Sequence, residues 1–220
     1  MIKKEIDLLS TLGLKGDLIV PYGAKGIVII AHSSGSSRHN DRHKTLAAHL
    51  NLKGLATLHL DLLTQEEERI DNLTREFQFN ISLLTERLVE VIRAVQLQED
   101  TKDLNIGLFS FNTGSAVVLT AAAAIPDAIK AVVSRSGRPE LADISLPDIY
   151  AATLFIVGEK DTLLMQLNQF AYDAIKTLHK QMHIVPEMSD FVGEPYQLKL
   201  VDQLAGQWFA NYLAAGDDDL

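Results

Sequence analysis

The residues that most suggest chemistry stand in the stretch "LFSFNTGSA", residues 108–116. An apolar run ends at Ser110, a short turn leads to Gly114, and an alanine-rich segment follows. A strand, a sharp turn and a helix in this order expose the side chain at the turn, and in some enzymes that residue is a nucleophilic serine. That residue is Asn112, whose amide is neither acidic nor appreciably nucleophilic. The stretch therefore predicts the frame of a nucleophilic site without its nucleophile.

Short apolar runs alternate with longer helical patterns along the chain. Strands are predicted at 26–32, 55–61, 105–110, 128–134, 152–158 and 182–186, and helices at 40–54, 80–96, 167–178 and 195–215. This alternation predicts an α/β fold, a mostly parallel twisted sheet of seven or eight strands with helices on both faces. The segments 2–10 and 15–20 are expected to form an antiparallel hairpin at the sheet edge. Loops that follow parallel strands converge on one edge, where ligands bind.

Composition narrows the class of protein. The 220 residues are expected to form one domain, 1–220, with a core of ordinary size. A net charge of −9 argues against a nucleic-acid or anionic-membrane surface. The chain has no cysteine, hence no disulfide and no thiolate site, and its N-terminus does not resemble a signal peptide. We expect a cytoplasmic protein with no cofactor and no metal.

Six segments, in order, resemble the α/β-hydrolase fold and, within it, the dienelactone-hydrolase-like group. They are "IVIIAHSSGSSRHNDR", "GLATLHLDLLTQEEE", "IGLFSFNTGSA", "VVSRSGRPELA", "LFIVGEKD" and "IVPEMSDFVGEP", and they cover most of residues 25–195. The likeness is to a bacterial group sometimes fused to, or encoded beside, phosphoribosyltransferases. It implies an α/β-hydrolase domain with a minimal lid.

The resemblance also implies a Ser, Asp and His triad, and this chain departs from it twice. The nucleophile elbow G-x-S-x-G reads Ser110 to Gly114, with Asn112 in the nucleophile position. Asp161 occupies the acid position, and Asp190 occupies the histidine position. Aspartate, with an ordinary pKa of about 4, is a poor base near neutral pH. The resemblance therefore predicts a pseudoenzyme that is inactive as an ordinary serine hydrolase.

Several other residues could in principle replace the nucleophile or the histidine base. Ser110, Thr113 and Ser115 lie near the turn, but Ser110 should point away from the site, and the other two should begin a helix. Deamidation of Asn112 to an aspartate nucleophile would still require a histidine base. His32 ends a predicted strand and matches the histidine of the family's H-G oxyanion motif, for which the resemblance implies a structural role. His39 and His43 are spaced i, i+4, but we interpret them as a loop histidine and a helix-surface histidine.

The remaining polar loop residues suggest a pocket remade for binding. The resemblance implies an oxyanion motif, part of which is replaced by Ser33 and Ser34. This replacement indicates either a pocket remade for binding or drift after a loss of activity. Thr113 opens the helix after Asn112. Arg38, Arg135 and Arg138 fall in loops at the predicted binding edge, where guanidinium groups could hold a carboxylate or phosphate. The plainer alternative is that Arg135 and Arg138 form structural ion pairs with glutamates, namely Glu66, Glu67 or Glu140.

Three functions stay open at this point. The first is a hydrolase-like protein that binds a small anionic ligand or a protein partner. The second is an active hydrolase of a small ester or lactone that uses Asp161, Asp190 and water. The third is a non-catalytic subunit or scaffold, with a phosphoribosyltransferase or a second copy of the chain as its partner.

Overall fold

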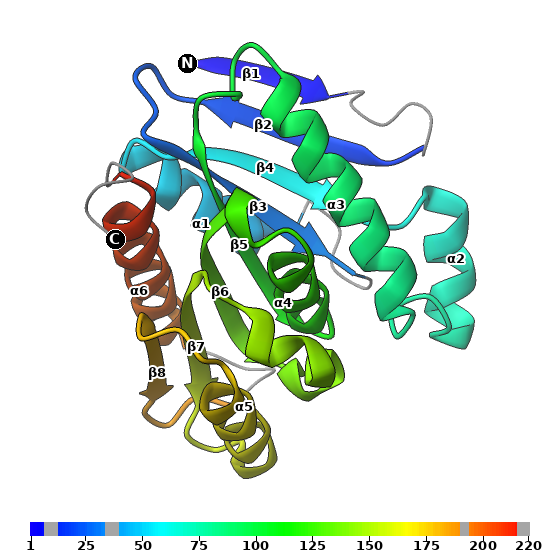
Figure 1. The fold of residues 1–220 in the computed structure, drawn as a ribbon, viewed down its shortest axis with the longest axis vertical. Helices are drawn as coiled ribbons and strands as arrows, with labels where there is room; N and C mark the ends of the chain where they lie inside the picture. Colours follow the sequence, from blue (N-terminus) through cyan, green and yellow to red (C-terminus); the bar gives the residue numbers. More distant parts are fainter. Residues whose placement is uncertain (7–12, 34–39, 190–193, 215–220) are drawn as a thin grey trace.

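A computed structural model describes residues 1–6, 13–33, 40–189 and 194–214. Within these ranges the chain forms an eight-stranded sheet in the order β1-β2-β4-β3-β5-β6-β7-β8 (Figure 1). The strands are β1 (Ile2–Ile6), β2 (Lys15–Val20), β3 (Gly26–His32), β4 (Ala56–Asp61), β5 (Asn105–Asn112), β6 (Ile129–Gly137), β7 (Ala152–Gly158) and β8 (Lys180–Val185). Strands β3 to β8 are parallel to one another, whereas β2 pairs antiparallel with both β1 and β4. The predicted fold class and edge hairpin are confirmed.

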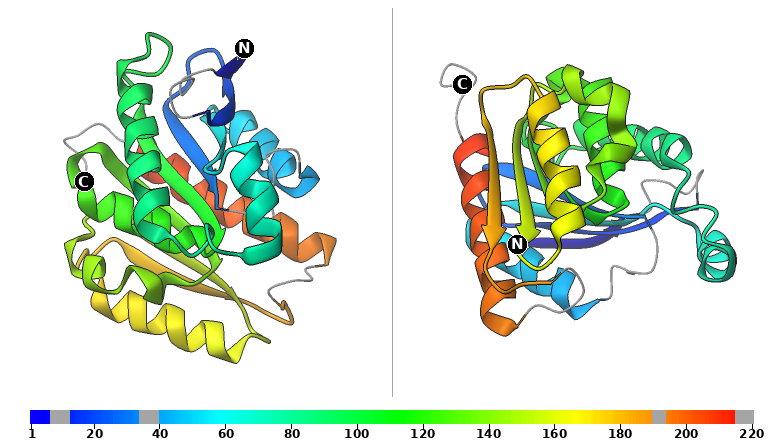
Figure 2. Two further views of the ribbon diagram at one scale, coloured as in Figure 1. Left: turned by 90° about the vertical axis from the view of Figure 1, so that its right-hand side faces the viewer. Right: turned by 90° about the horizontal axis from the view of Figure 1, so that it is seen from below.

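Helices cover both faces of this sheet. They are α1 (Asp41–Leu52), α2 (Gln65–Thr74), α3 (Ile81–Leu97), α4 (Gly114–Ala124), α5 (Thr162–Ala174) and α6 (Pro195–Leu213), with 3₁₀ segments at Pro126–Ala128 and Pro139–Asp148. Helices α1 and α6 pack on one face, and α3, α4 and α5 on the other (Figure 2). The sheet therefore has an apolar core on each side, which explains why β3 and β7 are buried along their whole length.

Helix ends follow local sequence signals. The Asn40 side chain caps α1 by accepting from the Arg42 N–H, and Gly54 follows this helix at φ 77°. Thr64 and Glu67 form a reciprocal capping box at the start of α2. Both bounds of the helix predicted at 167–178 are wrong, because α5 begins at Thr162 and ends at Ala174. Strand β6 also continues to Gly137, three residues beyond its predicted end. Helix α5 starts directly after Asp161, so this residue is the N-cap position of the helix.

No helix in the described part of the chain combines the length and apolarity needed to cross a membrane. Helix α2 lies beyond the carboxyl ends of β3 and β4 (Figure 1). It carries the segment 75–80 toward the same edge of the sheet as the predicted site. No separate lid domain is present among the described residues.

Candidate functional site

Asn112 ends β5 at a sharp turn whose backbone enters the left-handed region, with φ 51°. Asparagine tolerates positive φ better than most non-glycine residues, so it suits this conformation. The Asn112 carbonyl accepts a hydrogen bond from the Arg138 N–H at 3.0 Å, which ties the turn to the end of β6. The Asn112 side chain is exposed, as the apex residue of such a turn should be.

Glycine is required at position 114, where α4 begins directly after the turn. A Cβ placed there would lie 2.2 Å from the Ser110 Oγ. That hydroxyl is buried and donates to the Ala31 carbonyl at 2.8 Å, so it points toward β3 and away from Asn112. Ser115 is also fully buried. Neither serine is placed to replace the missing nucleophile.

A cavity of about 530 Å³ opens beside Asn112 at the carboxyl edge of the sheet. Five of the predicted site residues line it: Ser33, Asn112, Thr113, Arg138 and Asp161. The hydroxyls of Ser33 and Thr113 are hydrogen-bonded to each other at 3.0 Å, so Ser33 is held against the start of α4. Phe111 also lines the cavity. Further lining residues that the sequence did not single out are Arg75, Gln78, Phe79, Ser136, Lys160, Thr162, Leu163 and Leu164.

The other predicted site residues divide into two groups. Ser34, Arg38 and Asp190 lie outside the described residues, so their predicted roles stay predictions. Arg135 is described but does not line this cavity; it lines a second one between α1 and α6. The single arginine cluster predicted from sequence is thus separated, because Arg135 and the next residue, Ser136, point to opposite faces of the sheet edge.

Three cations and one carboxylate line the Asn112 cavity. Arg138 pairs with Glu140, as the structural alternative predicted, and Lys160 pairs with Glu187 at 2.8 Å. The Glu187 carboxylate raises the pKa of the exposed Lys160 amine, so that amine stays charged. Arg75 forms no ion pair with any described residue and sits at φ 58° directly after α2. Arg75 is therefore the cation of this cavity whose charge is not already balanced.

Two buried polar atoms of this cavity have no hydrogen-bond partner among the described residues. One is the Oγ of Ser136, a residue that is 2% exposed and has φ 44°. The other is the Oδ2 of Asp161, whose side chain does not cap α5 although it precedes it. Buried polar groups normally have partners, and exceptions are typical of sites that bind or react. The two atoms are a hydroxyl oxygen and a carboxylate oxygen of residues that line the cavity.

Backbone strain is concentrated at the same place. The non-glycine residues with positive φ in the described ranges are Arg75, Asn112, Ser136 and Glu187. The first three line the cavity, and Glu187 pairs with a fourth lining residue. Such conformations cost free energy and persist where the surrounding structure enforces them, most often at functional sites.

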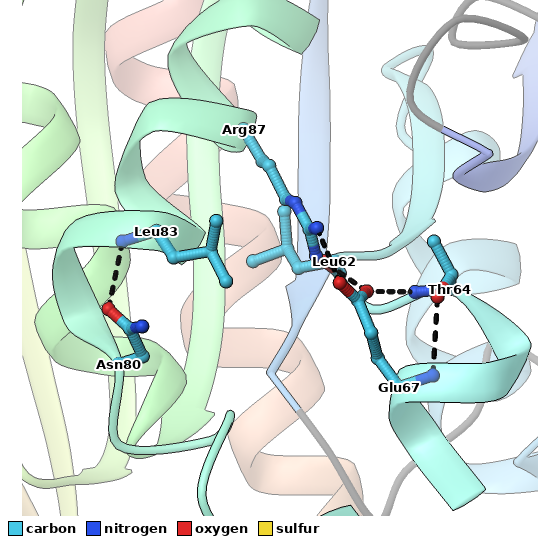
Figure 3. A network of polar contacts seen from close by, with 6 residues as sticks. All are labelled: Leu62, Thr64, Glu67, Asn80, Leu83 and Arg87. Carbon is cyan, nitrogen blue, oxygen red and sulfur yellow. Dashed lines mark hydrogen bonds and ion pairs between the residues drawn. The ribbon is translucent and has the colours of Figure 1, made fainter. Parts of the chain in front are cut away.

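One wall of the cavity is held by a polar network between α2 and α3 (Figure 3). Arg87 donates two hydrogen bonds to the Glu67 carboxylate, at 2.7 and 2.8 Å, and a third to the Leu62 carbonyl at 2.9 Å. These contacts, together with the bond from Thr64, lower the pKa of Glu67 to about 2. Buried Asp71 then accepts from the N–H groups of Phe77 and Gln78, which shapes the segment that brings Arg75, Gln78 and Phe79 to the cavity.

His32 and His43 pack against Phe111 and do not line the Asn112 cavity. His32 stacks on His43 with ring centroids 4.3 Å apart, and His43 stacks on Phe111 at 4.6 Å. The prediction that His43 lies on the helix surface is wrong, because α1 turns this side chain inward and leaves it 7% exposed. Burial, reinforced by His43 and His59, lowers the pKa of His32 well below its usual value. No histidine lines the Asn112 cavity among the described residues, and these residues hold no cluster of three or more histidines and carboxylates arranged for a metal ion.

Comparison with known proteins places this site in a family context. The model of the dienelactone hydrolase family matches residues 14–185. The crystal structure of a dienelactone hydrolase from Anabaena variabilis superposes with a TM-score of 0.92 at 44% identity, covering 96% of this chain and 98% of that one. Est1E from Butyrivibrio proteoclasticus has the same fold at 14% identity, with a TM-score of 0.77 over 95% of this chain and 98% of its own.

Two curated relatives from strains of Mycobacterium tuberculosis bear the provisional name phosphoribosyl transferase. Each is 43% identical over 198 residues, a match that covers 90% of this chain. The same match covers 44% of each relative, so the chain spans less than half of their length. The family model and the Anabaena structure both point to a dienelactone hydrolase over the region that contains Asn112 and Asp161. The chain belongs to the dienelactone hydrolase family.

Proposed function

We propose that the Asn112 cavity binds a small, hydroxyl-bearing anion and does not carry out serine-dependent hydrolysis. The observation that carries the proposal is Asn112 at the strained apex of the elbow, in a cavity whose described lining contains no histidine. An amide at this position can donate and accept hydrogen bonds, but it cannot form an acyl-enzyme. The site therefore keeps the means to hold a ligand and lacks the ordinary means to attack it.

The lining residues define the ligand class. Arg75 and Arg138, which both line the cavity, supply guanidinium groups that suit a phosphate or carboxylate. At the other end, Asp161 needs a hydrogen-bond donor, which a ligand hydroxyl supplies, and Ser136 can donate to a ligand oxygen. A sugar phosphate is the simplest class of molecule that meets both requirements, and a volume of about 530 Å³ accommodates one.

Isothermal titration calorimetry with ribose 5-phosphate tests the binding. We expect saturable binding that weakens about tenfold in Arg75→Ala, because one charge-assisted contact is lost. Arg93→Ala is the matched control, since Arg93 is an exposed arginine on α3 that does not line the cavity. Equal weakening in both variants, or no binding of ribose 5-phosphate, contradicts the proposed ligand class.

The absence of serine chemistry is tested separately with a fluorophosphonate probe and mass spectrometry. We expect no labelled serine in the folded protein. Stoichiometric labelling at any serine would overturn this part of the proposal and favour an active hydrolase.

A second candidate function comes from the length of the curated relatives. They are more than twice as long as the matched region and bear a phosphoribosyl transferase name. A hydrolase-like unit could therefore act as the non-catalytic partner of a phosphoribosyltransferase. Co-purification of the two proteins from the source organism as a complex of defined mass is the expected result, and a chain that always sediments alone argues against it.

A further inference from the structure

A second cavity, of about 200 Å³, lies between the first turns of α1 and α6. It reaches the ends of β5 and β6 from the face opposite α4. Among described residues, Phe111 is the one lining residue that it shares with the Asn112 cavity. The volume equals the share of about seven water molecules in the liquid, enough for a small metabolite. The two cavities are thus separate compartments on either side of one aromatic ring.

The second cavity contains a carboxyl group without a direct partner. Asp202 on α6 is half-buried and forms no hydrogen bond or ion pair with any described residue. Burial raises the pKa of Asp202 to about 6, and the attraction of Arg135 only partly offsets this. At neutral pH the group is therefore still mostly ionised, and a cation or hydrogen-bond donor at this position would stabilise it.

Arg135 supplies the opposite charge from the end of β6. Arg135 lines the same cavity, and its charge attracts Asp202. Arg135 has another interaction within the chain. Five N–H donors nevertheless allow one guanidinium to serve more than one acceptor. The cavity therefore presents a cationic and an anionic group that face a common space.

The remaining walls are largely apolar. Phe109 and Phe111 come from alternate positions of β5, so both rings project from the same face of that strand. Leu46 of α1 and Val201 of α6 close the sides. Polar residues of the first turns of α1 also contribute to the lining, namely Asp41, Arg42, His43 and Thr45, and Asp41 forms an ion pair with Lys44 at 3.7 Å. A ligand here must bring both charges and an apolar body.

We propose that this cavity is a binding site for a small zwitterion with an apolar side chain, of which an aliphatic α-amino acid is the simplest. The ligand carboxylate binds Arg135, the ligand ammonium binds Asp202, and the side chain packs on Phe109 and Phe111. A ligand with only a carboxylate would leave Asp202 unpaired beside a like charge. A ligand with only an amine would offer no carboxylate to the Arg135 guanidinium. The site includes neither Asn112 nor Arg75, so its test is independent of the function proposed above.

Calorimetric titration with L-leucine tests the site, with two analogues that each lack one charge. They are 4-methylpentanoate, without the amine, and 3-methylbutylamine, without the carboxylate. We expect leucine to bind in the millimolar range or tighter, and each analogue to bind about tenfold more weakly. Failure of both L-leucine and L-phenylalanine to bind at millimolar concentration, or equal binding of leucine and 4-methylpentanoate, would overturn the proposal.

Variants then assign the two charges. Asp202→Asn, which keeps the shape, is expected to weaken leucine about tenfold while leaving 4-methylpentanoate unchanged or tighter. Asp173→Asn, on the exposed face of α5, is the matched control and should change nothing. Arg135→Gln should weaken both carboxylate-bearing ligands; if this variant unfolds by circular dichroism, the Asp202→Asn series decides alone. Leucine binding that is unchanged in Asp202→Asn counts against the proposal.

Discussion

The contact between Glu67 and Arg87 should determine how firmly α2 is held over the Asn112 cavity. The Glu67 carboxylate is bound by both terminal nitrogens of Arg87 and by the Thr64 N–H. Only 20% of the Glu67 side chain and 14% of the Arg87 side chain are exposed. Such a paired, partly buried contact is worth more than a surface ion pair.

The magnitude follows from the pKa of Glu67. A fall from the usual 4.5 to about 2 corresponds to about 3 kcal/mol at most, since one pKa unit is about 1.4 kcal/mol. Water screens the exposed fifth of the side chain, so we expect Glu67→Gln to lower the free energy of unfolding by about 2 kcal/mol at pH 7. Because the folded-state pKa is depressed, the contribution is complete above about pH 5. It is lost as the pH falls toward 2.

Urea unfolding of the wild type and Glu67→Gln at pH 7, 5 and 3 measures this difference. The gap between the two proteins should narrow as the pH falls, because the wild-type carboxylate becomes protonated. Glu66→Gln is the control, since Glu66 meets Arg69 at 3.3 Å on the exposed surface and should cost about 0.3 kcal/mol. A difference that does not change with pH, or an equal cost for Glu66→Gln, would refute the assignment.

Three further outcomes are expected. Asn112→Ser should remain unlabelled by a fluorophosphonate probe, because no histidine among the described residues lines the cavity; stoichiometric labelling would contradict this. The wild type should lose stability as the pH falls below about 6.5, since the unfolded chain takes up a proton that buried His32 resists. His32→Leu should flatten that dependence in urea unfolding, and an unchanged slope would assign the effect elsewhere. Gly114→Ala should destabilise by about 2 kcal/mol, because its Cβ would meet the Ser110 Oγ at 2.2 Å. Adding Ser110→Ala should recover most of this loss in thermal unfolding, and no recovery would mean that another contact causes the strain.

Two features of the Asn112 cavity suggest that it is maintained for ligand binding. A random loss of activity gives no reason for three cavity residues to hold positive φ, nor for Ser136 and Asp161 to stay buried without partners. Both features cost stability, and a bound ligand would offset that cost. The titration with ribose 5-phosphate is therefore also a test of whether the site is maintained.

Much of the fold could be predicted from sequence because the signals are local. The apolar run at 26–32 and its counterparts require burial on both faces, and this alone predicts a parallel sheet with helices on each side. Asn40 and Thr64 cap helices and Pro195 lies in the first turn of another, positions that these residue types favour because caps act over a few residues. The turn at Asn112 was also recognisable, and the cavity beside it contains Asp161 as the resemblance implied.

What the sequence by itself determined is thus the frame, in which a strand, a turn at Asn112 and a helix follow one another within a mostly parallel sheet. The tertiary structure decided which side chains share a space. Arg135 and Arg138 are three residues apart yet line different cavities, because the bend at the end of β6 separates the two faces. Arg75 and Asp202 enter the two cavities from helices remote in sequence, and His43 is buried by the packing of α1. No local sequence pattern predicts which of these residues line the same cavity, because this depends on how the edge of the sheet brings distant segments together.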